Sequence, residues 1–387
     1  MANSENRILT THAGSLPRPK ALAEMLGRKS RHEAVDEAAL EQTITEATNR
    51  VIARQLECGI DIGNNGEQSR ESFFTYVQHR MSGFSGKSQR PFFSELMRFP
   101  GYLEMMGRNI SQMQVDLMHA PQATSEIRYT GIAEVKKECD DFRRALEAQK
   151  SHFVEPFMTA TSPGIVAAAM LNAHYPSLPD YVRALGAALK TEYATIVNAG
   201  YTLQIDAPDL ATERHTSFAG KPLKEFLDFV DVVIDAINDA IAGLPMEKVR
   251  LHVCWGNYEG PHVDDVPLDD IAEHIYRAKV SALLLSMANP RHEHEYRSLK
   301  RHPLPAGMNL IVGAIDSTTN YVEHPEVVAD RIERAATALG DPRRVTAGTD
   351  CGFDTTAGFG MVADELVWEK LRALSDGAAI ASRRLFG

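Results

Sequence analysis

A histidine and two cysteines stand where two predicted strands end. His252 and Cys254 close the apolar run 249–254, and alternation along a strand puts both side chains on one face. Cys351 follows a second strand-like run at 345–349. If the two strand ends meet, an imidazole and two thiols converge and leave one tetrahedral position open, which is typical of a catalytic zinc site. The spacing therefore predicts that His252, Cys254 and Cys351 bind Zn²⁺.

The same residues also have a simpler interpretation. A His-x-Cys pair arises often by chance. A cysteine near the end of a strand is more often a small buried hydrophobic residue than a ligand. The metal hypothesis therefore depends on what the rest of the chain places around the two strand ends.

Composition restricts the class of protein. The chain has 387 residues, of which 44% are hydrophobic and 24% charged, as in ordinary globular proteins. Four cysteines in such a length do not form a disulfide framework, and the first residues lack the apolar stretch of a signal peptide. We therefore expect a cytoplasmic protein without a membrane partner. The net charge of −11 argues against nucleic acid as a partner, and a homo-oligomer is left open.

Apolar runs alternate with amphipathic segments along the chain. The predicted strands are residues 7–11, 59–62, 153–159, 202–206, 249–254, 282–286, 310–315 and 345–349. The predicted helices are residues 37–55, 131–148, 181–198, 223–241, 268–278 and 325–339. Strands that alternate with helices indicate a parallel sheet, and eight such units close a (β/α)8 TIM barrel. A doubly wound open sheet is the alternative, but the first strand is not followed by G-x-G-x-x-G.

One segment departs from this alternation. Residues 68–128 are rich in aromatic side chains, among them Phe73, Phe74, Phe92 and Phe93. We expect a packed insertion, or lid, after the second strand. The predicted organisation is thus a single catalytic barrel over residues 1–387 with residues 68–128 inserted.

Polar side chains follow the predicted strands, at the end of a barrel where active sites lie. Besides the three proposed ligands they include Ser15, Glu67, Asp206, Ser286, Asp316 and Asp350. Random surface loops are also polar, and Glu67 or Asp206 can equally cap a helix or form an ion pair in a loop. Because every predicted strand ends in such a residue, the group as a whole predicts a site.

Other candidates have plainer interpretations. His292 and His294 lie among charged neighbours, which predicts a solvated loop, with hydrogen-bonded support of the metal ligands as the alternative. The pair Asp264-Asp265 is expected on a solvated acidic face. Cys58 and Cys139 fall within predicted helices, and we interpret them as packing residues.

Taken together, these motifs resemble the C-terminal catalytic barrel of the cobalamin-independent methionine synthase family over essentially the whole chain. The resemblance is carried by residues 10–19, Asn65-Gly66-Glu67, residues 203–206, His252-Val253-Cys254 and Asp350-Cys351-Gly352. The chain is more similar still to stand-alone relatives of the epoxyalkane:coenzyme M transferase type. That similarity lies in residues 250–257, 260–263 and 289–292.

The resemblance implies a role for each site residue. It makes His252, Cys254 and Cys351 the zinc ligands. The expected substrate-binding residues are Ser15, Glu67 and Arg291, and the expected proton-handling residues are Asp206 and His262. Two departures stand out: Ser286 occupies the place of a family Glu that can ligate zinc, and Ala207-Pro208 follows Asp206 where an acidic residue is usual. We also expect the chain to lack the folate-binding N-terminal half of full-length synthases, which makes methyltetrahydrofolate an unexpected donor.

The activity so implied is alkyl transfer to or from a small organic thiol, by a transferase or a lyase. Zinc would deprotonate the thiol, and the thiolate would attack an electrophilic alkyl donor. One alternative is a compact methionine synthase-like methyltransferase that uses a non-folate or corrinoid donor. Two others are a degenerate barrel that binds ligand without turnover, and metal-free chemistry at Glu67 and Asp206.

Overall fold

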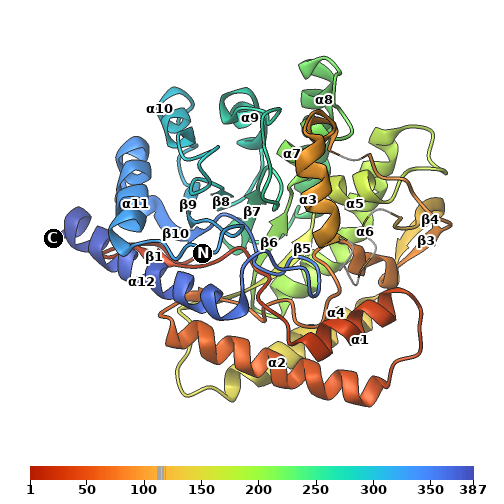
Figure 1. The fold of residues 1–387 in the computed structure, drawn as a ribbon, viewed down its shortest axis with the longest axis horizontal. Helices are drawn as coiled ribbons and strands as arrows, with labels where there is room; N and C mark the ends of the chain where they lie inside the picture. Colours follow the sequence, from red (N-terminus) through yellow and green to blue (C-terminus); the bar gives the residue numbers. More distant parts are fainter. Residues whose placement is uncertain (92, 111–114, 116, 118) are drawn as a thin grey trace.

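The computed structural model describes residues 1–91, 93–110, 115, 117 and 119–387. Within these residues, an eight-stranded parallel sheet has the order β1-β10-β9-β8-β7-β6-β5-β2. A parallel bridge between Thr11 and Ile62 joins its two edges, so the sheet closes into a barrel (Figure 1). The predicted (β/α)8 TIM barrel is confirmed. Its strands are β1 Leu9–Thr10, β2 Ile62–Gly63, β5 Glu155–Thr161, β6 Thr202–Asp206, β7 Val249–Val253, β8 Ala282–Leu285, β9 Asn309–Ile315 and β10 Val345–Thr349.

The outer helices explain why the strands are buried on both faces. Every residue of β6, β7, β8 and β10 is buried, as expected for a parallel sheet that is covered by helices. Helix α8 (Leu223–Ala240) shows the matching pattern, with Phe226, Val230, Val233 and Ile237 buried at helical spacing. The hydrophobic effect therefore fixes the barrel and leaves the strand ends free for polar residues.

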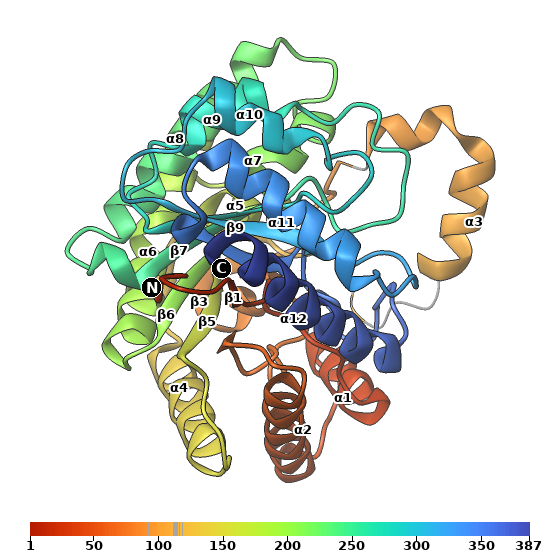
Figure 2. The ribbon, with the colours of Figure 1, turned by 90° about the vertical axis from the view of Figure 1, so that its left-hand side faces the viewer.

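Among the longer helices outside the insertion, α1 (Lys20–Ser30) and α12 (Asp364–Phe386) were not predicted, and α12 packs against α11 (Pro325–Leu339) (Figures 1 and 2). The other longer helices lie close to their predicted positions. They are α2 Glu37–Glu57, α4 Ile132–Glu147, α6 Leu178–Asn198, α9 Leu268–Ile275 and α11 Pro325–Leu339. Short helices complete the barrel at α5 Pro163–Ala169, α7 Asp209–Thr212 and α10 Ser298–Arg301.

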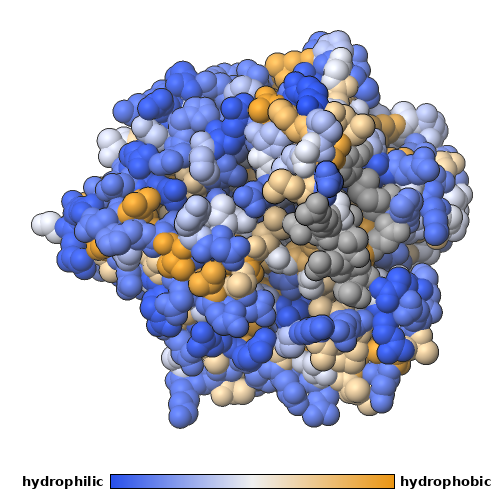
Figure 3. All heavy atoms as spheres, in the orientation of Figure 1, coloured by the Kyte–Doolittle hydropathy of each residue, from blue (hydrophilic) through white to orange (hydrophobic). Residues whose placement is uncertain are grey.

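An insertion after β2 breaks the regular alternation, as predicted. It contains two 3₁₀ turns, Thr75–His79 and Ser94–Arg98, the helix α3 (Pro100–Ile110) and an antiparallel pair of strands, β3 (Met81–Ser85) and β4 (Gln122–Tyr129). Phe92 lies outside the described residues. Helix α3 stands away from the barrel in Figure 2, and hydrophobic and hydrophilic residues are interspersed at its position in Figure 3.

Buried ion pairs attach this insertion to the barrel. Arg70 and Arg80 donate to Glu138 on α4, with N–O distances of 3.0 and 2.6 Å. Arg80 also contacts Glu192 on α6 at 3.1 Å. Burial alone would raise the pKa of Glu138, but the two arginines lower it to about 2. Glu138 is therefore ionised at neutral pH.

None of the helices in the described part of the chain combines the length and apolarity needed to cross a membrane.

We predict that Glu138→Ala lowers the free energy of unfolding by about 3–5 kcal/mol, because removing one partner leaves buried charges unpaired. Urea unfolding monitored by circular dichroism measures this change. Lys137→Ala on the same helix is the control, since Lys137 forms only exposed ion pairs worth about 0–1 kcal/mol. Equal effects of the two substitutions would contradict the structural role of Glu138.

Candidate active site

A cavity of about 750 Å³ lies at the C-terminal ends of the strands. Polar side chains form one part of its lining, which we call the floor: Ser15, Glu67, Asp206, His252, Cys254 and Cys351. Aromatic and methionine side chains form much of the rest, which we call the apolar wall: Phe73, Phe74, Phe93, Tyr102, Met106 and Phe359. Most of the apolar wall comes from the insertion. The cavity therefore joins a polar reactive region of the barrel to an apolar region outside it.

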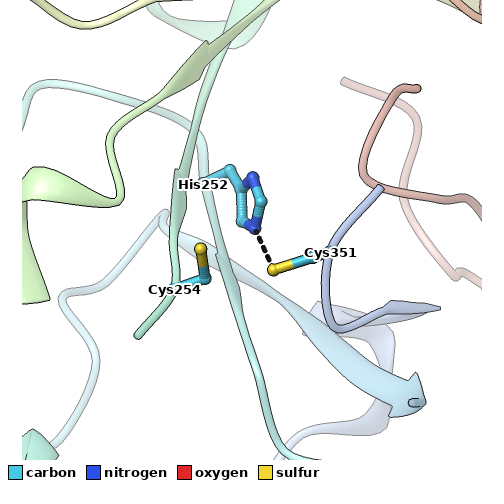
Figure 4. Close-up of side chains that lie close together, drawn as sticks. All are labelled: His252, Cys254 and Cys351. Atoms are coloured by element: carbon cyan, nitrogen blue, oxygen red, sulfur yellow. Dashed lines mark hydrogen bonds between the residues drawn. The ribbon is translucent and has the colours of Figure 1, made fainter. Parts of the chain in front are cut away.

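His252, Cys254 and Cys351 come together on the floor, as predicted. His252 lies on β7, Cys254 follows the strand directly, and Cys351 lies in the loop after β10 (Figure 4). His252 Nε2 is 3.9 Å from Cys351 Sγ, and the three donor atoms all lie within 4.8 Å of one another. The three residues are buried, and both cysteines are free thiols. An imidazole and two thiols at this spacing form a donor set that a single metal ion can bridge.

Asp206 sets the orientation of the imidazole. His252 Nδ1 lies 2.9 Å from Asp206 Oδ1, so the ring donates its Nδ1 hydrogen to the carboxylate and turns Nε2 toward Cys351. Gln204 donates to the same carboxylate oxygen at 2.7 Å, and Arg250 donates to Gln204 at 2.9 Å. Asp206 thus serves here as a positioning residue.

The buried imidazole and thiols perturb one another. Burial disfavours the charged imidazole, but the Asp206 carboxylate and the Cys254 sulfur raise the pKa of His252 to about 10. The pKa of Cys254 is well below its ordinary value, because Cys351 and His252 donate to its sulfur. The pKa of Cys351 is raised, since its hydrogen is held by Cys254 and burial disfavours its thiolate. The imidazole thus becomes more basic and the Cys254 thiol more acidic, because the two groups stabilise each other's charged form.

Asp350 shapes the loop after β8. Its carboxylate accepts the backbone N–H groups of Met287, Ala288 and Asn289 at 2.7–2.9 Å. Ser286 Oγ donates to the backbone carbonyl of Asp350 at 3.1 Å. Ser286 stands at the position where the resemblance implies a Glu in the family. Its side chain therefore lies beside the loop that carries Cys351.

Ser15 and Glu67, also on the floor, each have a side-chain oxygen whose hydrogen bonds are not satisfied by the described residues. Glu67 Oε1 accepts from Thr159 at 2.8 Å, whereas Glu67 Oε2 and Ser15 Oγ are buried and have no hydrogen-bond partner among the residues that the structure describes. A Cβ atom on Gly352 would lie 2.0 Å from Ser15 Oγ, so only glycine permits this approach. Glu67 adopts a φ of 57°, a strained value for a non-glycine residue.

Burial and the neighbouring Asp206 charge raise the pKa of Glu67 to about 7. A buried carboxylate with one unpartnered oxygen gains stability when a cation approaches. The floor is therefore suited to the positively charged end of a ligand.

Two predicted site residues lie apart from the floor. Arg291 is exposed and does not line the cavity. His262 is buried and lines a smaller neighbouring cavity, where its Nδ1 lies 2.9 Å from Asp265. Neither residue belongs to the donor group of His252, Cys254 and Cys351, although Cys351 also lines the smaller cavity.

Two sequence interpretations are wrong. Asp265 is not on a solvated face; its carboxylate is buried and contacts His215, His262 and His292. His292 is likewise not solvated, and its ring stacks on Trp255 at a centroid distance of 4.2 Å. Their local sequence is charged, but residues distant in the chain enclose both side chains.

The supporting residues Gln204 and Arg250 were also missed. A signal was present, because residues two apart on a strand share a face. Gln204 therefore lies on the same face of its strand as Asp206, and Arg250 lies on the same face as His252. A buried guanidinium in a strand that also carries a candidate metal ligand indicates a row of hydrogen-bonded polar side chains inside the barrel.

Known proteins with similar sequence or structure agree with this architecture. The profile of the family described as "Cobalamin-independent synthase, Catalytic domain" matches residues 8–126. A methionine synthase of Sulfolobus acidocaldarius is 25% identical over 359 residues, covering 91% of this chain and 88% of its own. Another from Sulfurisphaera tokodaii is 24% identical, with coverages of 97% and 93%.

A solved structure supports the fold. The B12-independent methionine synthase of Shewanella sp. W3-18-1, determined with selenomethionine, superposes with a TM-score of 0.70. The two sequences are 21% identical, and the alignment covers 98% of this chain and 99% of that one. The family profile and the relatives of matching length thus make the chain similar to the cobalamin-independent methionine synthase family, and the solved structure shows the same barrel fold.

Proposed function

We propose that this protein is a zinc-dependent enzyme that transfers a methyl or other alkyl group to a small organic thiol. The convergence of His252, Cys254 and Cys351 on the floor of one cavity carries the proposal. Zinc bound there would lower the pKa of a substrate thiol and hold it as a nucleophile. Homocysteine is the first candidate thiol, because the archaeal relatives are named methionine synthases.

The donor chemistry fits zinc. An imidazole nitrogen and two thiolates suit a borderline-soft ion, and three protein donors leave a position for the substrate. His252 donates its Nδ1 hydrogen to Asp206, the usual arrangement for an imidazole that ligates metal through its other nitrogen. Ser286 has a short neutral side chain, so this proposal uses no fourth protein ligand.

Ser15 and Glu67 are suited to hold the amino-acid end of the thiol. Glu67 Oε2 and Ser15 Oγ are buried polar atoms without partners, and such atoms are rare unless a ligand or water satisfies them. We assign the ammonium group to Glu67 and the carboxylate to Ser15. The thiol would then extend toward the cysteines on the same floor.

The apolar wall is suited to the alkyl donor. A volume of about 750 Å³ lies within the range of about 300–1,000 Å³ that is usual for drug-sized ligands. It therefore leaves room for a donor beside the thiol. We propose that residues 68–128 form the donor side of a single catalytic barrel, because Phe73, Phe74 and Tyr102 contribute to the wall.

The apolar character of this wall favours a second candidate. An enzyme of the epoxyalkane:coenzyme M transferase type, or a lyase that runs the transfer in reverse, would use the same floor with a different thiol. Incubation with homocysteine or 2-mercaptoethanesulfonate, each with electrophilic methyl and alkyl donors, followed by mass spectrometry of the products, separates the candidates. Thiol binding without any product would instead indicate a degenerate barrel.

We predict that Cys254→Ser binds about one zinc ion per chain fewer than wild type, because serine is a poor replacement for a thiolate ligand. Metal analysis of protein purified without chelators measures this. Adding homocysteine to wild type near pH 7 should release a proton, since a free thiol has a pKa near ~8.5. Cys58→Ser, at a buried cysteine outside the floor, is the control. Equal zinc content and equal proton release in Cys254→Ser and wild type would refute the site.

Asp206→Asn should weaken zinc binding by about 10–100-fold, because the amide no longer provides the charged acceptor that orients His252. Competition with a chromophoric chelator gives the affinity. Asp209→Asn is the matched control, since Asp209 is buried nearby but accepts from Ser162 and does not line the cavity. An unchanged zinc affinity in Asp206→Asn would show that Asp206 does not orient His252 for metal binding.

The charge of Glu67 should control the binding of amino acids. Methionine carries the amino-acid groups without a thiol, so its affinity reports on Glu67 rather than on the metal. With a pKa of about 7, Glu67 is mostly protonated at pH 6 and ionised at pH 8, so we predict about tenfold tighter binding at pH 8. Isothermal titration of Glu67→Gln should show weak binding that does not change between these values. The same pH dependence in Glu67→Gln would contradict the assignment.

A further inference from the structure

A second group of metal-binding side chains lies beside the cavity, apart from the cysteines. It consists of His215, His262, Asp265 and His292, which we call the rim cluster. His215 follows α7, His262 and Asp265 lie in the loop after β7, and His292 lies in the loop after β8. At most 4% of any of these four side chains is exposed. Three loops of the barrel rim thus meet at one buried carboxylate.

The donor atoms are close together. Asp265 Oδ2 lies 2.9 Å from His262 Nδ1 and 2.6 Å from His292 Nε2. Asp265 Oδ1 lies 3.0 Å from His215 Nδ1, yet neither of these two atoms has an aligned hydrogen-bond partner. The donor atoms of His262, Asp265 and His292 all lie within 4.8 Å of one another, a spacing that one ion can bridge, and His215 Nδ1 approaches the other carboxylate oxygen.

The hydrogen atoms of His262 argue for a cation at this point. His262 Nε2 lies 3.1 Å from the backbone carbonyl of Tyr258, and a carbonyl only accepts, so Nε2 must carry the hydrogen. A neutral imidazole has one such hydrogen, which leaves a lone pair on Nδ1 facing Asp265. A second proton on the ring removes this repulsion at the 2.9 Å separation, and a metal ion bound by Nδ1 and the carboxylate would replace that proton. Donation of the other ring N–H to a carbonyl is also what metal-bound histidines usually show.

His215 and His292 leave further polar atoms without partners. His292 Nδ1 is 3.7 Å from Glu295, beyond hydrogen-bond distance, and both ring nitrogens of His215 lack an aligned partner. Buried polar atoms without partners are rare in folded proteins, and they often mark a place where an ion or a water molecule binds. These orphaned atoms and the close spacing are two independent observations that point to a ligand.

We propose that the rim cluster binds one divalent transition-metal ion, with zinc as the first candidate. Two imidazoles and one carboxylate, those of His262, His292 and Asp265, are a donor set that zinc accepts, and a shift of His215 toward them would complete a tetrahedron of protein ligands. Such a closed site is structural rather than catalytic. This inference does not depend on the proposed transferase activity.

The ion would hold the rim of the cavity together. Glu95 of the insertion accepts the backbone N–H groups of His262, Val263 and Asp264, and the hydroxyl of Tyr258. Tyr258 itself lines the cavity. A metal at the rim cluster would therefore fix both the loop after β7 and the inserted segment that rests on it.

The test uses zinc and cobalt(II) on full-length variants. Wild type should bind about two zinc ions per chain, and Cys254→Ser/Cys351→Ser about one, because the rim cluster contains no thiolate. Cobalt(II) in that double variant should give ligand-field bands without thiolate charge-transfer absorption. Adding His262→Asn should abolish the remaining site, whereas adding His294→Asn, at a neighbour outside the cluster, should preserve it.

Failure of the double variant to bind zinc at saturating free metal would overturn the proposal, and would indicate that a protonated imidazole occupies the cluster instead. If the double variant does not fold, Asp265→Asn in the wild-type background gives the answer. It should lose about one of two ions while its cobalt(II) form retains thiolate charge-transfer absorption. Retention of all bound metal by Asp265→Asn would equally refute the rim site.

Discussion

The hydrogen bond between Asp206 and His252 is the interaction on which the floor of the cavity depends. At 2.9 Å it decides which ring nitrogen faces the cysteines, since the nitrogen that donates to the carboxylate cannot bind a metal. Asp206 is itself held by Gln204, and Gln204 by the guanidinium of Arg250 inside the barrel. The orientation of one imidazole is thus fixed by a polar chain that is enclosed by the strands. A rigid barrel can keep such a chain in place better than a surface loop can.

Two buried carboxyl groups, Glu138 beneath the insertion and Glu67 on the floor, have pKa values that are shifted in opposite directions. Glu138 is buried but fully paired with arginines, and its pKa falls to about 2. Glu67 is equally buried, yet one oxygen lacks a partner, its pKa rises to about 7 and its backbone is strained. Glu138 therefore stabilises the fold, whereas Glu67 has a buried oxygen that is suited to accept a hydrogen bond from a ligand. Unsatisfied groups concentrated in one cavity are typical of binding sites.

Much of this could be predicted from sequence because a parallel barrel gives a strong local signal. The strands at 202–206 and 345–349 have the predicted bounds, and the chain places His252 and Cys351 at strand ends that converge on one cavity. Asp265 could not be predicted in the same way: its neighbours in sequence are charged, and its burial depends on histidines from two other loops. Helix α12 had a readable pattern of buried residues at helical spacing that was overlooked. Local periodicity thus predicts elements and strand ends, whereas contacts between loops require the folded chain.

The central claim is that His252, Cys254 and Cys351 hold a metal whose open position receives the sulfur of the substrate. X-ray absorption at the selenium edge, with selenohomocysteine bound to the wild-type protein, tests it most directly. Because the probe atom is on the substrate, a metal at any other site does not contribute to the signal. We predict a zinc neighbour at bonding distance from selenium in wild type and none in Cys254→Ser. Bound selenohomocysteine with no metal neighbour in the zinc-loaded wild type would contradict the account.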